Sequence, residues 1–334
     1  MTQRSSAANA LRVLLAALFA SACLGSAGCL LLAGKAVSAV REANADLPPK
    51  GELNTTQTRS LIFGGQTRTY LAQIPAGPGP FPIVVLLHGG TQTAESVWKQ
   101  TSLPVYAQQQ NFIVLAPQGI GKHWNDGRGS TIAGDAASTA DDVGFLRALI
   151  AQTIKQDRGA RDAAFMVGVS NGGFMTQRYA CEAADTLRAA AVVIATLPQA
   201  LAQRCHPARR LPWLAINGAK DPIVPFAGQV AGPARGGEPQ PALLSADASF
   251  AFWGDQAGCA APRSERISEH IDRRTRSCAN GQQAVQYVML DAGHVWPGLS
   301  VSRPLLAMRL GGTTLEIDAG TVIGGFFTST LRSR

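Results

Sequence analysis

Short continuous apolar runs alternate with segments of helical spacing along most of the chain. The runs have the length and the β-prone composition of strands that are buried on both faces of a parallel sheet. They lie at residues 83–87, 112–116, 164–169, 189–195, 213–217 and 285–290. Segments with apolar residues at helical spacing lie at 94–109, 143–156, 173–183, 250–256 and 321–331. This order predicts an α/β fold with a mostly parallel sheet and helices on both faces.

Turn residues mark two further features. Residues 61–63 and 68–74 flank Gly64 and Gly65, which is the pattern of a β-hairpin. The stretch 221–247 is rich in Gly and Pro and is expected to form a loop or small lid.

The first 45 residues differ from the rest. Arg4 and Arg12 precede an apolar run at 13–34, and small residues lie before Cys23 and Cys29. This pattern suits a cleaved signal peptide, and its length also suits an N-terminal membrane or lipid anchor. We therefore expect a leader at 1–45, a polar linker at 46–59 and one domain at 60–334 in a secreted, periplasmic or surface-anchored protein.

The charge balance changes this picture little. The chain has 334 residues, a net charge of +8 and a pI near 9.5. Its basic residues are scattered, and no basic stripe is interleaved with aromatic residues. The composition therefore favours a solvated basic surface and no nucleic-acid partner.

Four cysteines lie outside the leader. An even number in an exported chain suggests disulfides, and four cysteines allow three pairings. We expect neighbours in sequence to pair, while buried free thiols remain the alternative, and a zinc site lacks the Cys-x-x-Cys spacing. The expected pairs are Cys181 with Cys205 and Cys259 with Cys278.

The pattern Gly168-Val169-Ser170-Asn171-Gly172 stands between a predicted strand and a predicted helix. This is the context of a nucleophile elbow, in which a serine on a sharp turn exposes its hydroxyl. The two glycines are expected to avoid collisions at the tight turn. Ser170 is therefore the candidate nucleophile, and the N–H of Asn171 is a candidate oxyanion donor.

A serine nucleophile needs a base and an orienting carboxylate, which follow it along the chain in this type of site. His294 follows a predicted strand directly, unlike His206 and His270. Asp221 also follows a predicted strand and precedes His294. The alternatives for the acid are Asp247, Asp255 and Asp291.

Other candidates lie after the strand at 83–87. The N–H of Gly90 or of Thr91 is expected to complete the oxyanion hole, and His88 is expected to be structural. Trp124 is a candidate substrate platform, with an aromatic residue that covers the core as the alternative. Trp296 is the second candidate for substrate binding.

At these residues the chain resembles the poly(3-hydroxybutyrate) depolymerase and feruloyl esterase family of carbohydrate esterase type, which belongs to the α/β-hydrolases. The resemblance covers roughly residues 61–332. It rests on Leu87-His88-Gly89-Gly90, Trp124-Asn125-Asp126, Asp141-Asp142-Val143-Gly144-Phe145, 168–173, Asp221-Pro222 with Val224-Pro225, and Gly293-His294 with Trp296-Pro297-Gly298.

This resemblance implies an α/β-hydrolase fold, a triad of Ser170, Asp221 and His294, and both disulfide pairings. The chain shows no Thr-rich linker or separate polymer-binding domain, which argues against attack on solid polyester.

The sequence thus predicts an exported serine esterase for hydroxyalkanoate oligomers, feruloyl esters or acetyl esters. This enzyme is expected to need no cofactor or metal, and small or oligomeric esters are its expected partners. An acyltransferase or peptidase with the same triad is one alternative. A non-catalytic surface protein that binds ligands on a hydrolase fold is the other.

Overall fold

The computed structural model describes residues 56–129, 139–235, 238–299 and 310–332. All of them belong to one compact unit that spans residues 53–334. The expected leader at 1–45 lies outside the described residues. Within the described part, no helix combines the length and the apolar composition needed to cross a bilayer.

A ten-stranded sheet forms the centre of the unit, in the order β1-β2-β4-β3-β5-β6-β7-β12-β11-β10. The strands from β4 to β12 in this order are parallel, and the pairs at both edges are antiparallel. The strands are β1 (Gln57–Phe63), β2 (Gln66–Gln73), β3 (Phe81–Leu87), β4 (Ile113–Pro117), β5 (Gly159–Val169), β6 (Ala189–Val193), β7 (Trp213–Gly218), β10 (Arg263–Ser268), β11 (Ile271–Ser277) and β12 (Gln283–Met289). A separate two-stranded sheet pairs β8 (Gly232–Arg235) with β9 (Glu238–Gln240).

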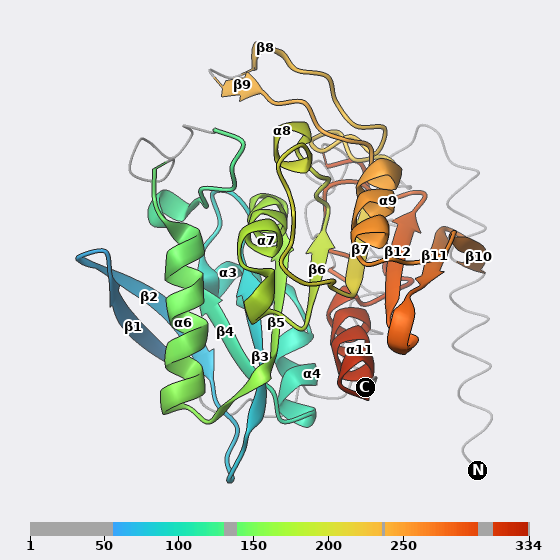
Figure 1. Cartoon of the computed structure of the whole chain (residues 1–334). Coiled ribbons are helices and arrows are strands. Elements are labelled where there is room, and N and C mark those ends of the chain that lie inside the picture. Colours follow the sequence, from blue (N-terminus) through green and yellow to red (C-terminus); the bar gives the residue numbers. More distant parts are fainter. Residues whose placement is uncertain (1–55, 130–138, 236–237, 300–309, 333–334) are drawn as a thin grey trace, which may run out of the picture. The chain divides into compact units, whose positions relative to one another are not determined.

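Helices cover both faces of the large sheet (Figure 1). They are α3 (Ala94–Gln100), α4 (Leu103–Gln109), α6 (Asp142–Gln156), α7 (Asn171–Glu182), α8 (Gln199–Ala202), α9 (Ala246–Gln256) and α11 (Ala319–Arg332). Helices α6, α7 and α9 pack on one face, whereas α3, α4 and α11 pack on the other. The predicted α/β architecture is therefore confirmed.

Strand β3 shows why the apolar runs contain no polar positions. Ile83, Val85 and Leu87 pack into the core under α6 and α7, and Val84 and Leu86 pack into the core under α3 and α4. All five side chains are fully buried. A strand between two helical layers must be apolar on both faces because each face is removed from water.

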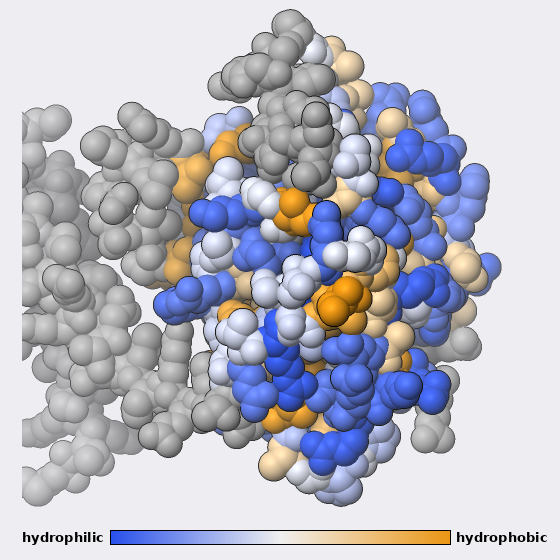
Figure 2. All heavy atoms as spheres, turned by 90° about the vertical axis from the view of Figure 1, so that its left-hand side faces the viewer, coloured by the Kyte–Doolittle hydropathy of each residue, from blue (hydrophilic) through white to orange (hydrophobic). Residues whose placement is uncertain are grey.

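The predicted N-terminal hairpin is present as β1 and β2. Gly64 and Gly65 form its turn with φ values of 58° and 76°, which only glycine adopts at low cost. β1 begins at Gln57, inside the segment expected as linker. Figure 2 shows this side of the molecule, where hydrophilic residues predominate and apolar residues gather in small groups only.

The segment 94–109 does not form the single predicted helix. It forms α3 and α4, which are separated at Thr101 and Ser102. Pro104 lies in the first turn of α4, where its missing N–H costs nothing. In the middle of a continuous helix the same ring would remove a hydrogen bond and clash with the preceding turn.

The charged run at 265–276 forms a hairpin that the sequence pattern did not predict. Its strands, β10 and β11, lie at the edge of the sheet, and β10 is largely exposed. Glu265 lies opposite Arg273, and Arg266 lies opposite Asp272. Such cross-strand ion pairs take the place of apolar alternation on a solvated edge.

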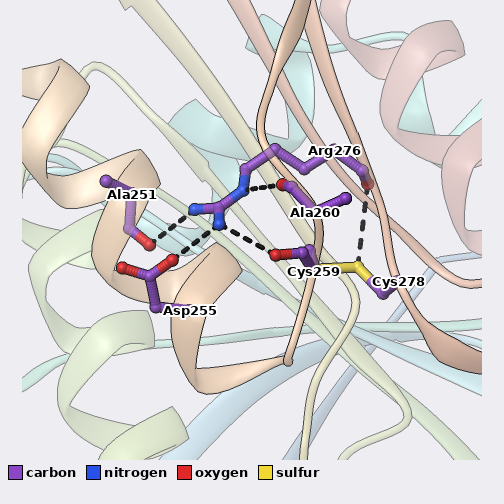
Figure 3. Close-up of a disulfide and its surroundings, with 6 residues drawn as sticks. All are labelled: Ala251, Asp255, Cys259, Ala260, Arg276 and Cys278. Atoms are coloured by element: carbon purple, nitrogen blue, oxygen red, sulfur yellow. Dashed lines mark hydrogen bonds and ion pairs between the residues drawn. A yellow bond between two sulfur atoms is a disulfide. The ribbon is translucent and has the colours of Figure 1, made fainter.

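Both expected disulfides are present, Cys181–Cys205 and Cys259–Cys278. Figure 3 shows the second one beside Arg276, whose guanidinium is almost fully buried between α9 and the chain that follows it. Arg276 donates to the carbonyl oxygens of Ala251, Cys259 and Ala260 and to the carboxylate of Asp255. The disulfide and this arginine together fix the end of α9 to β11.

Candidate active site

Ser170 lies at the sharp turn between β5 and α7. Its backbone has φ 52° and ψ −117°, which is rare for a residue other than glycine. Its N–H donates to the carbonyl oxygen of Val193 at 3.0 Å, which holds the strained turn against β6. The local geometry is that of a nucleophile elbow.

Three side chains from separate strand ends meet at this turn. His294 Nε2 lies 2.9 Å from Ser170 Oγ, and His294 Nδ1 lies 2.8 Å from Asp221 Oδ2. The other carboxylate oxygen of Asp221 accepts the N–H groups of Ile223 and Val224, both at 2.8 Å. The side chains of Asp221 and His294 are only 2% and 10% exposed, so this line is shielded from water.

The alternative acids and bases lie elsewhere. His270 pairs with Glu316 at 2.6 Å, and His206 is exposed. Asp247 and Asp255 bind Arg274 and Arg276. Asp291 lies beside His270, at 3.8 Å.

The three backbone N–H groups that were expected near the oxyanion differ in whether they already have an acceptor. Asn171 is the first residue of α7, where the first N–H groups of a helix have no partner within it. Within the described part of the chain, the N–H groups of Asn171 and Gly90 donate to no protein acceptor. The N–H of Thr91 is not available, because it donates to the carbonyl oxygen of Lys122 at 2.9 Å. The expectation for Thr91 is therefore wrong.

Comparisons with known proteins give relatives that are named as esterases. No protein-family model matches the sequence. NocK of Nocardia uniformis subsp. tsuyamanensis, named an esterase, is 29% identical over 73% of this chain and 75% of its own length. Feruloyl esterase B of Piromyces equi is 24% identical over 61% of this chain and 36% of that protein. The structure of an acetyl xylan esterase from Aspergillus awamori aligns with a TM-score of 0.51 at 15% identity, over 77% of this chain and 99% of that one.

The chain has the α/β-hydrolase fold and is similar in sequence to esterases. The structural match establishes the fold, and the sequence relatives are named as esterases. The resemblance seen in the motifs of the sequence is thereby confirmed.

In this α/β-hydrolase the side chain of Asn171 ties the elbow to the loop after β4. Its Oδ1 accepts the N–H of Trp124 at 2.8 Å, and its Nδ2 donates to Asp126 at 2.5 Å. Asp126 is buried and also binds Arg128. The sequence pattern indicated a role for the N–H of Asn171 alone, and Asp126 stood out only as part of the Trp-Asn-Asp motif.

The two tryptophans do not lie where a substrate would stack on them. Trp124 is fully buried and donates through Nε1 to the carbonyl oxygen of His88 at 2.9 Å. Trp296 is 2% exposed and belongs to the core on the α11 side of the sheet. Both side chains are buried in the core, which corrects the expectation that they bind substrate.

His88 is a neutral structural residue of this α/β-hydrolase. Its Nδ1 donates to Gly89 O at 2.8 Å, and its Nε2 accepts the N–H of Gly119 at 3.0 Å. Burial lowers the pKa of His88 from 6.5 to about 4, because the charged ring would lose its hydration. The positive charge of His123 would also lower this pKa.

The lowered pKa of His88 predicts a loss of stability in mild acid. The unfolded chain takes up the proton near pH 6.5 and the folded chain only near pH 4, so stability falls as pH falls through this window. The expected loss is up to about 3 kcal/mol in the free energy of unfolding. Urea unfolding of the wild type and of His88→Gln between pH 7 and pH 4 measures it. The variant should lack this part of the pH dependence, and the control His206→Gln, at an exposed position, should retain it. Equal slopes for wild type and His88→Gln would contradict the assignment.

The elbow also predicts which glycines tolerate a methyl group. A Cβ on Gly168 would lie 2.0 Å from the carbonyl oxygen of Gly172, and one on Gly172 would lie 2.5 Å from that of His88. We expect Gly168→Ala to lower the free energy of unfolding by more than about 3 kcal/mol. The added methyl group would collide with backbone atoms, which cannot move aside as a flexible side chain can. The control is Gly325→Ala on the exposed side of α11, where nothing lies within 4 Å. It should gain about 0.5–1 kcal/mol, and a tolerated Gly168→Ala would show that the turn is not constrained.

Proposed function

We propose that the chain is an exported serine esterase that hydrolyses carboxylic esters through an acyl-enzyme. Hydroxyalkanoate oligomers, feruloyl esters and acetyl esters are the proposed substrate classes. The observation that carries the proposal is the unbroken line from Ser170 Oγ through the His294 ring to Asp221. The esterase names of the sequence relatives support the choice of ester over other acyl compounds.

In the first half of the reaction, His294 Nε2 takes the proton of the Ser170 hydroxyl while Oγ attacks the ester carbonyl carbon. Asp221 holds Nδ1–H of His294, so that Nε2 presents its lone pair to the serine. The N–H groups of Asn171 and Gly90 stabilise the oxyanion. The alcohol then leaves with the proton from Nε2, and the acyl group stays on Ser170.

In the second half, water attacks the acyl-enzyme and gives its proton to His294 Nε2. The tetrahedral intermediate collapses, the C–O bond to Ser170 breaks, and Nε2 returns the proton to Oγ. The products are an acid and the free enzyme, so no cofactor is consumed.

Export rests on a separate observation. Both disulfides join residues that are close in sequence, and such bonds persist in oxidising compartments. They support export of the domain, and they fit a cleaved leader and a retained anchor at residues 1–45 equally well.

A fluorophosphonate probe tests the proposal at the level of chemistry. Such a probe phosphonylates an activated serine, and peptide mapping should place the label on Ser170, with no label on the Ser170→Ala variant. The same preparation should release acid from 4-nitrophenyl butyrate and should not transfer the acyl group to added alcohol in preference to water. An unlabelled Ser170 in folded protein would overturn the proposal, and preferential transfer would replace it with an acyltransferase.

A further inference from the structure

A cavity of about 300 Å³ is lined by segments that follow the carboxyl ends of β4, β6 and β7. It is bounded by the loop after β4, by α8 and by the chain that flanks the β8–β9 pair. Most of its walls are apolar, formed by Pro198, Ala200, Ala231, Pro241 and Ala242. Its polar lining consists of Arg128, Gln199 and Gln203, and no carboxylate from the described residues lines it.

Arg128 is held rigidly at the wall of this cavity. Its Nε and Nη2 donate to one oxygen of Asp126 at 2.9 and 2.6 Å, and its guanidinium lies 3.9 Å above the ring of Phe174. The third nitrogen, Nη1, donates to no acceptor in the part of the chain that the structure describes. An arginine has five N–H donors in a fixed plane, so donors remain for a ligand.

The same contacts place Arg128 at a fixed distance from Ser170. Asp126 accepts from Asn171 Nδ2, and Asn171 follows the proposed nucleophile directly. Phe174 lies one helical turn beyond Ser170, since its N–H donates to the carbonyl oxygen of Ser170. The helical turn from Ser170 to Phe174 and the contact between the Phe174 ring and Arg128 together place the guanidinium on the order of 10 Å from Ser170. A short substrate can span this distance.

The surroundings of Arg128 add positive charge. Next to it, Gly127 is approached by Arg178 and Arg204, whose nearest atoms lie 3.4 and 3.6 Å from the position of a Cβ on this glycine. Arg178 pairs with Glu182. Arg204 is exposed and forms no ion pair with the described residues. The potential at this wall is therefore positive even though Asp126 balances one guanidinium.

We infer that this cavity is a subsite for a free carboxylate carried by the ester substrate, with Arg128 as its recognition residue. The inference rests on the proposed function and names its substrate class. Apolar walls suit the hydrocarbon part of such a substrate, and a preorganised guanidinium suits its carboxylate. Of the proposed ester classes, a hydroxyalkanoate oligomer carries a free carboxylate at its end, whereas feruloyl and acetyl groups carry none.

A pair of esters that differ in whether the distal carboxyl group is free or methylated tests the inference. The probes are 3-(butyryloxy)butyrate, whose free carboxylate lies on the alcohol side of the scissile ester as in a hydroxyalkanoate oligomer, and its methyl ester, and the readout is release of butyrate. We expect kcat/KM to be at least tenfold higher for the free acid at low ionic strength. Added salt should reduce this ratio because it screens the attraction.

Variants show which residues cause the preference for the free acid over the methyl ester. Gln199→Glu places a negative charge on the cavity wall without touching the Arg128–Asp126 pair, and it should reduce the ratio to about 1 or below. Arg128→Gln should also remove the preference. Arg209→Gln, which removes one exposed positive charge away from the cavity lining, is the matched control and should leave the ratio unchanged.

A binding measurement separates this inference from the proposed function. Calorimetry with Ser170→Ala should show the dimer of 3-hydroxybutyrate binding at least tenfold more tightly than its methyl ester. Equal binding, or equal kcat/KM for the two butyryl esters in an active enzyme, would overturn the carboxylate subsite and leave the serine esterase intact. Tighter binding of the acid without any turnover in the wild type would support the subsite and overturn the proposed function.

Discussion

Replacing Ser170 by alanine is expected to lower kcat/KM for 4-nitrophenyl butyrate by about 10⁶-fold, since the whole triad acts through this one oxygen. The variant lacks the atom that forms the acyl-enzyme, and water would have to attack the ester directly. The remaining oxyanion donors should still leave a rate above that of the uncatalysed reaction. Initial rates of nitrophenol release at high enzyme concentration measure the difference.

The fold should not change in this variant. The N–H of Ser170 donates to Val193 whatever the side chain, and alanine adopts the positive φ of 52° no less readily than serine. Thermal unfolding of Ser170→Ala should therefore match the wild type. Ser264→Ala, on the exposed strand β10, is a control for loss of a hydroxyl and should keep full activity. Turnover by Ser170→Ala at a tenth of the wild-type rate or more would rule out the triad.

The strand ends explain how much of the site can be predicted from the sequence. Ser170, Asp221 and His294 each follow an apolar run, and the carboxyl ends of parallel strands meet at one edge of the sheet. The order of the runs therefore indicated that the three side chains lie together. It also indicated that His206, which follows no strand, lies apart.

Local backbone geometry explains what could not be predicted. The N–H of Thr91 turns to Lys122 because Thr91 adopts a φ of 63°, and no feature of the apolar pattern reports that dihedral. The burial of Trp124 depends on its contacts with His88 and Asn171, which come from distant segments. The hairpin of β10 and β11 is polar on an exposed edge, so it lacks the alternation that identifies a strand.

The two oxygens of Asp221 have different tasks in this geometry. One accepts the N–H groups of Ile223 and Val224, which fixes the orientation of the carboxylate, and the other faces His294 Nδ1. An asparagine at this position would keep its carbonyl oxygen on the two backbone donors. Its amide NH₂ would then face His294 and would donate to Nδ1. The imidazole would carry its proton on Nε2 and would present that proton, not a lone pair, to Ser170.

Asp221→Asn is therefore expected to lower kcat by about 10⁴-fold at neutral pH, through the wrong tautomer of His294. The free energy of unfolding should change little, because both backbone N–H groups keep their acceptor. Asp221→Ala removes that acceptor as well and should in addition lose about 1–3 kcal/mol of stability. Comparing the two variants in kcat and in urea unfolding separates the electronic role of the carboxylate from its structural one. An Asp221→Asn enzyme within tenfold of the wild-type kcat would show that His294 is oriented by another group, and the proposed proton path would fail at its first step.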